Sequence, residues 1–357
     1  MLTQIDRFPF VSVIFPIRNE AVFLVRSLGA VLAQDYTAHG MEIILLDGLS
    51  TDNSQEIASA LAASYPQVSL RLLDNPGKIV PTGINIALRQ AKGEIIIRVD
   101  GHCIPAPDYV SKCVQHIQRD GVDGVGGSID TIGSTHLANA IAIGMSSPFG
   151  VGNSAFRTLS DKSMLVDTVP FPAFTREIID RAGLYDEEMA RNEDDEYSYR
   201  IRELGGKILL ADDVHSVYFS QGTRKGLGKQ YYQYGLWKVR VLQKHPRQMS
   251  LRQFVPPALV LGLIVSGLLA LFTLAHPSYI LFFLSSFVPL LYLFANLLAS
   301  CYTAFKRGWG YFPRLPVIFA ILHLSYGLGF LVGFVKFWNR WGDKTGRVPV
   351  WPNASGG

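Results

Sequence analysis

Ile95-Ile-Ile-Arg-Val-Asp100-Gly-His102 is a short apolar run that ends in a carboxylate and an imidazole two residues apart. The run follows Gly93 and is rich in β-branched residues, a pattern that predicts a buried strand entering from a turn. In open α/β sheets, ligands bind beyond the carboxyl ends of the strands, so Asp100 and His102 are expected at a binding edge. Both side chains point the same way and can bind one divalent cation. The alternative is that Asp100 only forms the turn.

The segments before this run alternate between strand and helix patterns. In chain order, the expected strands and helices are Phe10–Ile17, Asn19–Leu32, Ile43–Leu46, a helix through Ala63, Val68–Leu73, Pro81–Ala91 and Gly93–Val99. Such alternation predicts a Rossmann-like α/β fold, with a mostly parallel sheet and helices on both faces. The first strand-to-helix turn, residues 16–20, contains no glycine, which argues against dinucleotide-binding and P-loop proteins.

The composition divides the chain into an acidic half and a basic half. Residues 1–213 contain 18 Lys and Arg and 28 Asp and Glu, a net charge of −10. Residues 214–357 contain 15 Lys and Arg and a single acid, Asp343, a net charge of +14. The three cysteines form no Cys-x-x-Cys pair, and reduced thiols are expected.

The basic half contains three long uncharged stretches, Phe254–Pro277, Ser278–Phe305 and Leu315–Val335. Each exceeds the roughly 20 residues that span a hydrocarbon core. Hydrophobic helices in a soluble core are the alternative, but three in series without a charge favour an integral membrane protein. Phe8–Ile17 lacks a basic leader and a cleavage site, so this run is interpreted as the first strand and not as a signal peptide.

A basic segment precedes the first apolar stretch. Residues 223–253 contain eight Lys and Arg and no acid, which marks the cytoplasmic side and fits an amphipathic helix lying on the membrane. Because a membrane region follows at once, a nucleic-acid patch is disfavoured and no nucleic-acid partner is expected. A hairpin turning at Ala275–Ser278 agrees with this orientation, but three crossings would place the basic tail outside. A re-entrant third stretch and an exception to the charge rule both stay open.

Five motifs in a fixed order resemble the family 2 glycosyltransferases, which are inverting enzymes of the GT-A fold. The motifs are Val11–Glu20, Asp47–Asp52, Asn75–Lys78, Asp100–His102, and Gly183–Glu187 followed by Asn192–Arg200. The Asp-Gly-His variant, the Asn-Glu-Asp-Asp-Glu block and His323–Phe330 narrow the resemblance to membrane-anchored exopolysaccharide glucosyltransferases of the succinoglycan type.

The resemblance implies roles for the residues at matching positions. Asp194 would be the catalytic base, with Glu193, Glu196 and Arg200 as its support. The residues that would bind the UDP-sugar are Pro16, Glu20, Asp47, Lys78 and Asp100. Asp100 and His102 would also hold a divalent metal, Mn²⁺ or Mg²⁺, on the diphosphate.

The acid block Glu193–Glu196 has two interpretations on chemical grounds. Asp and Glu favour the first turn of a helix, so the block can be a solvated helix start. Clustered acids also raise one another's pKa, which suits one of them to act as a general base. Inversion at an anomeric carbon needs a single base, because the leaving diphosphate is stabilised by a metal. With the other motifs present, the catalytic interpretation is favoured.

The sequence therefore predicts four segments: a GT-A domain at residues 1–222, an amphipathic segment at 223–253, a transmembrane region of about three helices at 254–337, and a tail at 338–357. The predicted function is transfer of a sugar from a UDP-sugar to a polyprenyl-diphosphate-linked acceptor in exopolysaccharide or related glycan synthesis. The predicted location is the cytoplasmic face of a bacterial inner membrane, and self-association is compatible with the charge division.

Two other functions are weighed against this prediction. A processive polysaccharide synthase would carry Gln-x-x-Arg-Trp, but Leu236 stands at the Arg position of Gln233–Trp237. A non-catalytic membrane scaffold would not need the acids that the chemistry requires, and these acids are all present.

Overall fold

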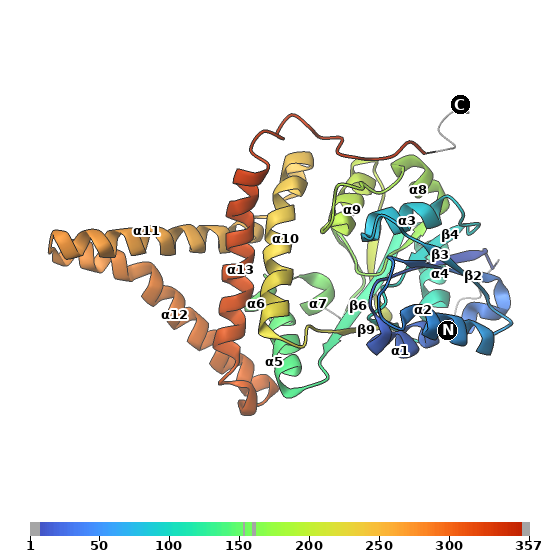
Figure 1. The fold of residues 1–357 in the computed structure, drawn as a ribbon, viewed down its shortest axis with the longest axis horizontal. Coiled ribbons are helices and arrows are strands. Elements are labelled where there is room, and N and C mark those ends of the chain that lie inside the picture. Colours follow the sequence, from blue (N-terminus) through green and yellow to red (C-terminus); the bar gives the residue numbers. More distant parts are fainter. Residues whose placement is uncertain (1–7, 153, 159–161, 352–357) are drawn as a thin grey trace. The chain divides into compact units, whose positions relative to one another are not determined.

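The structure is a computed structural model that describes residues 8–152, 154–158 and 162–351 (Figure 1). Its strands are β1 (Val11–Ile17), β2 (Met41–Asp47), β3 (Ser69–Asp74), β4 (Ile95–Arg98), β5 (Cys103–Pro105), β6 (Gly124–Ile132), β7 (Met164–Leu165), β8 (Ala173–Thr175) and β9 (Ile208–Phe219). Its α-helices are α1 (Ala21–Leu32), α2 (Ser54–Ser64), α3 (Val80–Leu88), α4 (Tyr109–Asp120), α5 (His136–Met145), α6 (Pro148–Val151), α7 (Ala155–Thr158), α8 (Arg176–Ala182), α9 (Glu193–Glu203), α10 (Arg224–Lys244), α11 (Val255–Ala275), α12 (Tyr279–Arg307) and α13 (Leu315–Lys336).

The first four strands form the parallel part of the sheet. β1 lies between β2 and β4, and β3 pairs with the other side of β2. Every residue of β1 and β2 is buried, as expected for apolar strands of a parallel sheet that is covered on both faces. The register aligns Ile17 with Asp47 and Asp47 with Asp74. The carboxyl ends of these strands therefore form one edge.

The remaining strands make the sheet mixed. The strand order is β3-β2-β1-β4-β8-β6-β9-β5, and β7 pairs with β9. β8 runs antiparallel to β4 and β6, and β9 runs antiparallel to β5 and β7. The predicted α/β fold class followed by apolar helices is confirmed, with an antiparallel part added to the parallel strands.

One cluster of buried side chains joins the parallel strands to α3, α8 and α9. Within it, the rings of Tyr185 and Tyr197 stack with their centroids 3.8 Å apart. Trp351 belongs to the same cluster and is 7% exposed, although it follows all three apolar helices in the chain. Burying a large apolar side chain stabilises a fold by ~1.5–3 kcal/mol. The segment after α13 is therefore part of the core of the α/β domain.

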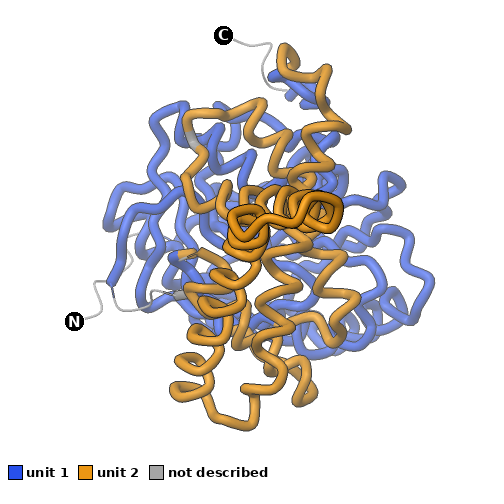
Figure 2. The backbone as a smooth tube through the Cα atoms, turned by 90° about the vertical axis from the view of Figure 1, so that its left-hand side faces the viewer, with its two compact units in different colours: residues 1–130, 155–218, 344–357 blue, residues 131–154, 219–343 orange. Residues whose placement is uncertain are grey.

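The chain forms two compact units, coloured separately in Figure 2. The α/β unit contains residues 1–130, 155–218 and 344–357, and the helical unit contains residues 131–154 and 219–343. Both units are therefore discontinuous in sequence, unlike the consecutive segments expected above. Residues 131–154 join the helical unit because α5 and α6 pack on α13. Residues 344–357 join the α/β unit because Trp351 enters its core.

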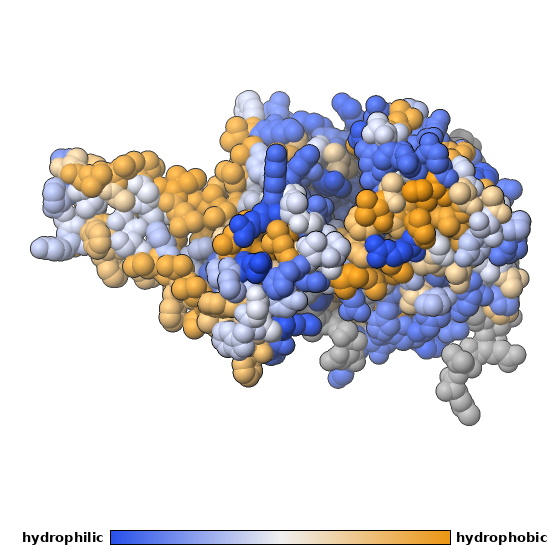
Figure 3. Space-filling model, turned by 60° about the horizontal axis from the view of Figure 1, so that its bottom comes forward, coloured by the Kyte–Doolittle hydropathy of each residue, from blue (hydrophilic) through white to orange (hydrophobic). Residues whose placement is uncertain are grey.

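Three helices of the helical unit are long and apolar enough to cross a membrane. Their ranges are Leu251–Ala275, Tyr279–Arg307 and Leu315–Lys336. Only 11% of the most apolar window is buried in each of the first two, against 44% in the third. α11 and α12 form a hairpin, and hydrophobic side chains occupy much of the face of it that Figure 3 shows, with paler, less hydrophobic patches between them. α13 instead lies beside α10 (Figure 1).

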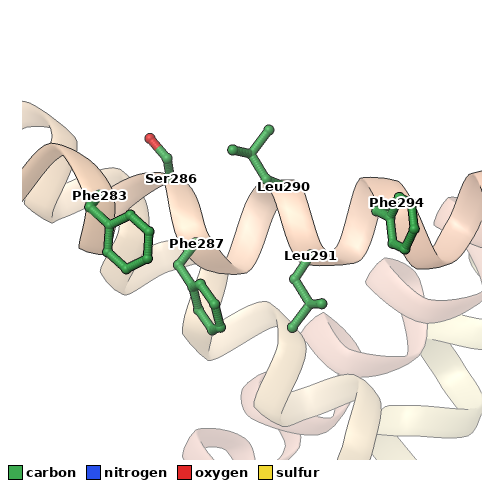
Figure 4. Close-up of a pocket in the computed structure, with 6 residues that line it drawn as sticks. All are labelled: Phe283, Ser286, Phe287, Leu290, Leu291 and Phe294. Carbon is green, nitrogen blue, oxygen red and sulfur yellow. The ribbon is translucent and has the colours of Figure 1, made fainter.

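A shallow apolar groove runs along α12 of the hairpin (Figure 4). It is lined by Phe283, Ser286, Phe287, Leu290, Leu291 and Phe294. No titratable side chain lines this groove, so it offers none of the groups that acid–base chemistry requires.

Candidate active site

Strained backbone marks the edge formed by the carboxyl ends of β1, β2 and β3. Five non-glycine residues in the described part of the chain have a positive φ angle. Asn19 (57°), Leu49 (56°) and Lys78 (60°) follow β1, β2 and β3, and Asn192 (59°) directly precedes the acid block. Such conformations cost about 1–3 kcal/mol each and concentrate at functional sites. The strain therefore gathers in the loops that carry the predicted site residues.

The loops after β1 and β2 are joined by hydrogen bonds of short polar side chains. Ser50 Oγ accepts from the Asn19 amide at 2.9 Å, and Asn19 Oδ1 accepts from the Thr51 amide at 2.8 Å. Ser54 Oγ accepts from the Glu20 amide at 2.9 Å. These bonds satisfy backbone groups where the sheet ends, so both loops are held in place before any ligand binds.

Asp47, a predicted nucleotide-binding residue, is fully buried at the end of β2. Its carboxylate accepts hydrogen bonds from the Ser50 amide at 3.0 Å and from Gln55 Nε2 at 2.5 Å. In this structure Asp47 therefore shapes the loop that would border a nucleotide. Pro16 is buried within β1, and Lys78 presents an exposed side chain from the third loop of the same edge.

Arg98 connects the strand end to the acid block. It is the last residue of β4, and its Nε donates to Asp100 Oδ1 at 2.8 Å while Nη2 donates to Glu193 Oε1 at 3.0 Å. Burial alone would raise the pKa of Asp100, but the guanidinium outweighs it and holds that pKa below its usual value. Two predicted site residues that are far apart in sequence thus share one cation.

His102 lies against the first loop. Its Nδ1 is 3.0 Å from Glu20 Oε1, and its ring meets Tyr218 edge-on with the centroids 5.0 Å apart. Burial disfavours the charged ring, yet Tyr218 and the hydrogen-bonded Glu20 prevail and raise the pKa of His102 to about 10. Gly101 permits this approach, because a Cβ there would lie 2.8 Å from Glu20 Cγ.

The acid block opens α9, and Asp194 is the acid with the most altered chemistry. Burial, followed by the Asp195 and Glu193 carboxylates, raises the pKa of Asp194 to about 7. The nearby Arg98 opposes this rise. A carboxyl group that titrates near neutrality is both available as a base and able to keep the proton that it accepts. The raised pKa expected for one acid of the block is found at Asp194.

Glu196 and Arg200, the other residues predicted to support the base, link α9 to the segment that precedes it. Arg200 Nη2 donates to Glu196 Oε2 at 2.7 Å, and Arg200 Nη1 donates to the Leu184 carbonyl at 2.7 Å. The guanidinium also lies 5.1 Å from the centre of the Tyr197 ring. Glu196 and Arg200 thus position α9 against residues 182–184, whereas Glu193 is paired with Arg98.

The structure brings the predicted residues together in two groups. Arg98 bonds both Asp100 and Glu193, and His102 bonds Glu20 and interacts electrostatically with Asp100. Glu196 and Arg200 form the separate pair described above. Sequence reasoning missed Arg98, although a signal existed: it is the only charged residue of the buried strand Ile95–Arg98. Charged side chains in such strands are rare unless paired.

The donor set at this edge fits a metal that is completed by a substrate. The described residues contain no group of three or more His, Cys, Asp or Glu side chains that could hold a metal ion alone. Asp100 would supply an oxygen and His102 its Nε2, because Nδ1 is bonded to Glu20. With a pKa of about 10 the free ring carries a proton at both nitrogens, so a metal would have to displace the proton of Nε2. Cations such as Mg²⁺ take one or two protein ligands together with substrate phosphates.

The mixed sheet, with polar loops at the carboxyl ends of its parallel strands, is the architecture of the GT-A class of glycosyltransferase. Residues 12–183 match the family model of Glycosyl transferase family 2. The chain is 28% identical over 331 residues to succinoglycan biosynthesis protein ExoA of Rhizobium meliloti, covering 92% of this chain and 96% of that protein.

A second relative is less similar in sequence. It is the dolichyl N-acetyl-alpha-D-glucosaminyl phosphate 3-beta-D-2,3-diacetamido-2,3-dideoxy-beta-D-glucuronosyltransferase of Methanococcus voltae, 22% identical over 92% of this chain and 98% of that protein. Among solved structures, the mannosyltransferase PcManGT from Pyrobaculum calidifontis, in complex with GDP-Man and Mn²⁺, has the same fold. Its TM-score is 0.60 at 18% identity, over 90% of this chain and 88% of that chain. The family match thus shows a family 2 glycosyltransferase domain at residues 12–183.

Proposed function

We propose that this enzyme transfers a sugar from a UDP-sugar to a polyprenyl-diphosphate-linked acceptor with inversion at the anomeric carbon. The observation that carries the proposal is Asp194, a carboxyl group with a pKa of about 7 beside the Arg98–Asp100 pair. One base with a neutral pKa suits a single displacement, in which the acceptor hydroxyl loses its proton as the sugar departs from the diphosphate.

In this proposal, the edge of the sheet binds the donor. Pro16 and the loops of Glu20, Asp47 and Lys78 border the nucleoside, and the exposed Lys78 ammonium offers a charge for a phosphate. Asp100 and His102 would hold a divalent metal on the diphosphate, and the metal would neutralise charge that develops on the leaving group. The PcManGT complex with Mn²⁺ supports such a metal.

Asp194 then accepts the proton of the acceptor hydroxyl. Its ionised form is needed for this step, and Arg98 keeps that form accessible against the neighbouring acids. Glu193 is held by the same guanidinium and therefore positions the start of α9. Glu196 and Arg200 fix the helix behind it, so that the base keeps its place during the reaction.

The helical unit and the relatives support the proposed acceptor and location. A polyprenyl-linked acceptor is anchored in a membrane. Three helices of this chain are long and apolar enough to cross one. The Methanococcus relative is named for a dolichyl-linked sugar phosphate, and the Rhizobium relative for succinoglycan biosynthesis. The basic segment before α11 favours an α/β unit on the cytoplasmic side of a bacterial inner membrane.

The test is a transfer assay with membranes that contain the enzyme. Membranes receive labelled UDP-glucose, UDP-galactose or UDP-GlcNAc, with GDP-mannose as the control for the nucleoside, and label is counted in the lipid fraction. One UDP-sugar is expected to label lipid, in a chelator-sensitive manner that Mn²⁺ or Mg²⁺ restores. Label from GDP-mannose alone would refute the UDP-sugar donor. A ladder of long polymer would make the enzyme processive, and no transfer at all would favour a scaffold.

A further inference from the structure

The segment after α13 binds the α/β unit, and this constrains the path of the chain through a membrane. The Arg347 amide donates to Asp186 Oδ1 at 2.7 Å, and the Arg347 carbonyl accepts from the Glu187 amide at 3.0 Å. Trp351 is buried in the core of the same unit. Residues 344–351 therefore lie on the same side of any bilayer as the α/β unit, and the number of crossings between Phe219 and Lys344 must be even.

The hairpin accounts for two crossings. α11 and α12 pack on each other, and most of their large apolar side chains are exposed, including Leu268, Leu271, Phe283 and Leu290 at 61% or more. Each helix is longer than the roughly 20 residues that a bilayer core requires. An exposed apolar surface of this extent needs lipid around it.

α13 differs from the hairpin because its partner is charged. A Cβ on Gly329 would collide with the Tyr232 carbonyl of α10, and a Cβ on Gly333 would lie 2.6 Å from the Leu236 carbonyl. At the far end, Gln243 Nε2 donates to the Phe337 carbonyl at 2.8 Å. α10 and α13 therefore lie side by side and run in the same direction. Both helices must consequently lie at the same depth relative to any bilayer.

α10 is unsuited to the interior of a bilayer. Its cationic residues are Arg224, Lys225, Lys229, Lys238, Arg240 and Lys244. Charges at the centre of a membrane helix are strongly unfavourable and therefore rare. Arg240 is fully buried, and its partners include Gln243 Oε1 at 2.6 Å, the Arg340 carbonyl at 3.3 Å and the Asp343 carboxylate at 3.5 Å. All three lie at or beyond the carboxyl ends of α10 and α13, so this charge is paired where the two helices end.

α13 also contacts α11, α12, α5 and α6, and its contacts with α5 and α6 place it at the same depth as α10. α5 and α6 belong to residues 131–154, a segment that leaves the α/β unit and returns to it, and its described residues contain no apolar helix of membrane length. His323 of α13 lies with Nε2 2.8 Å from the Phe149 carbonyl of α6. A Cβ on Gly144 of α5 would lie 2.6 Å from Ile318 of α13. The first half of α13 is therefore fixed to a segment that stays on the side of the α/β unit.

We propose that only α11 and α12 cross the bilayer and that α13, despite its length and hydropathy, lies with α10 at the membrane surface. The partner of this surface is the headgroup layer of the leaflet that faces the α/β unit. Exposed cations of α10, Arg224, Lys225 and Lys229, face solvent or anionic headgroups. This inference rests on the membrane location proposed above, and its test separates the two.

Cysteine labelling in spheroplasts tests the crossings. Cys103 and Cys113 are buried, so Cys301→Ser supplies a background with little labelling. Three single variants in that background place a thiol at the hairpin turn (His276→Cys), between α12 and α13 (Gly310→Cys) and after α13 (Val350→Cys, where the native side chain is 85% exposed). Each variant is treated with a membrane-impermeant maleimide before and after permeabilisation, and its transfer activity is measured in parallel.

The His276→Cys variant is expected to react in intact spheroplasts, and the Gly310→Cys and Val350→Cys variants only after permeabilisation. If positions 310 and 350 become accessible under different conditions, α13 crosses the bilayer and the inference is overturned. The fully inverted pattern would keep two crossings but refute the cytoplasmic orientation. Identical behaviour of all three variants would refute a membrane-crossing hairpin itself.

Depth in reconstituted vesicles provides a second measurement. Leu328, at mid-length of α13, is 47% exposed, and Leu268 of α11 serves as the matched control at 61%. A fluorophore on Leu328→Cys is expected to be quenched by lipids brominated near the headgroup, and one on Leu268→Cys by lipids brominated deep in the acyl chain. Deep quenching at both positions would contradict a surface location of α13.

Discussion

Asp100 and Asp194 both lie near Arg98 and have opposite acid–base properties. At the strand end, Asp100 is paired with the guanidinium and its pKa is lowered. At the helix start, burial and two neighbouring carboxylates raise the pKa of Asp194 to about 7, although the same arginine opposes them. The residue type is identical in both places. Direct pairing with one buried cation separates a carboxylate that stays charged from one that exchanges a proton.

The largest effect is expected from removing the exchangeable carboxyl. Asp194→Asn should lower kcat by about 10²–10⁴, the usual contribution of a general base, with little change in KM for the nucleotide sugar. Asp195→Asn is the matched control, because Asp195 is the neighbouring acid on the same helix turn. Transfer kinetics check this, and equal losses in the two variants would contradict a specific role for Asp194.

Removing Arg98, the cation that Asp100 and Glu193 share, should lower the free energy of unfolding. Arg98→Gln leaves Asp100 and Glu193 buried without their partner, and breaking such a pair costs about 3–5 kcal/mol. Denaturant unfolding of the solubilised protein measures this. Arg98→Lys keeps the charge but not the forked geometry, so an intermediate loss is expected. An Arg98→Gln protein as stable as the native one would remove Arg98 from its connecting role.

The pH dependence should have opposite signs for activity and stability. Activity requires ionised Asp194, so kcat/KM should fall as the pH drops below about 7. The folded pKa of Asp194 lies above the unfolded value, so its contribution to stability is complete at acidic pH and is lost as the pH rises through about 7. Asp194→Asn should therefore be more stable than the native protein at alkaline pH, with a gap that narrows on acidification. A gap that widens on acidification would contradict the raised pKa.

The smallest effect is expected at the metal-type ligand on the strand side. His102→Asp replaces an imidazole by a hard oxygen donor, which should reduce a preference for Mn²⁺ over Mg²⁺ by a few-fold. The ratio of transfer rates with the two metals measures this in native and variant enzyme. An unchanged ratio would show that His102 does not set metal selectivity.

Much of the α/β fold could be predicted because its strands are continuous apolar runs. Ile95–Val99 and Ile43–Leu46 have the pattern of buried parallel strands, and strands β4 and β2 occupy these runs in the structure. The antiparallel part could not be foreseen as well: β5, β7 and β8 are two or three residues long and carry no periodicity.

The candidate site was predictable where motifs are local and hidden where contacts are long-range. Asp100 and His102 share one strand end, so their spacing alone indicated a common ligand. The contact of Arg98 with Glu193 spans 95 positions, and no local pattern reports it. The same holds for Trp351, whose burial depends on a segment that three apolar helices separate from the rest of the domain.

The burial of Trp351 has a consequence for biosynthesis. Amino-terminal domains commonly fold while translation continues, but the core of this α/β domain includes a tryptophan that the ribosome delivers only after α11, α12 and α13. Until then, Asp186 and Glu187 lack the Arg347 backbone that holds them, shortly before the acid block begins. The core of the α/β unit is therefore completed last, after α11, α12 and α13 have been synthesised.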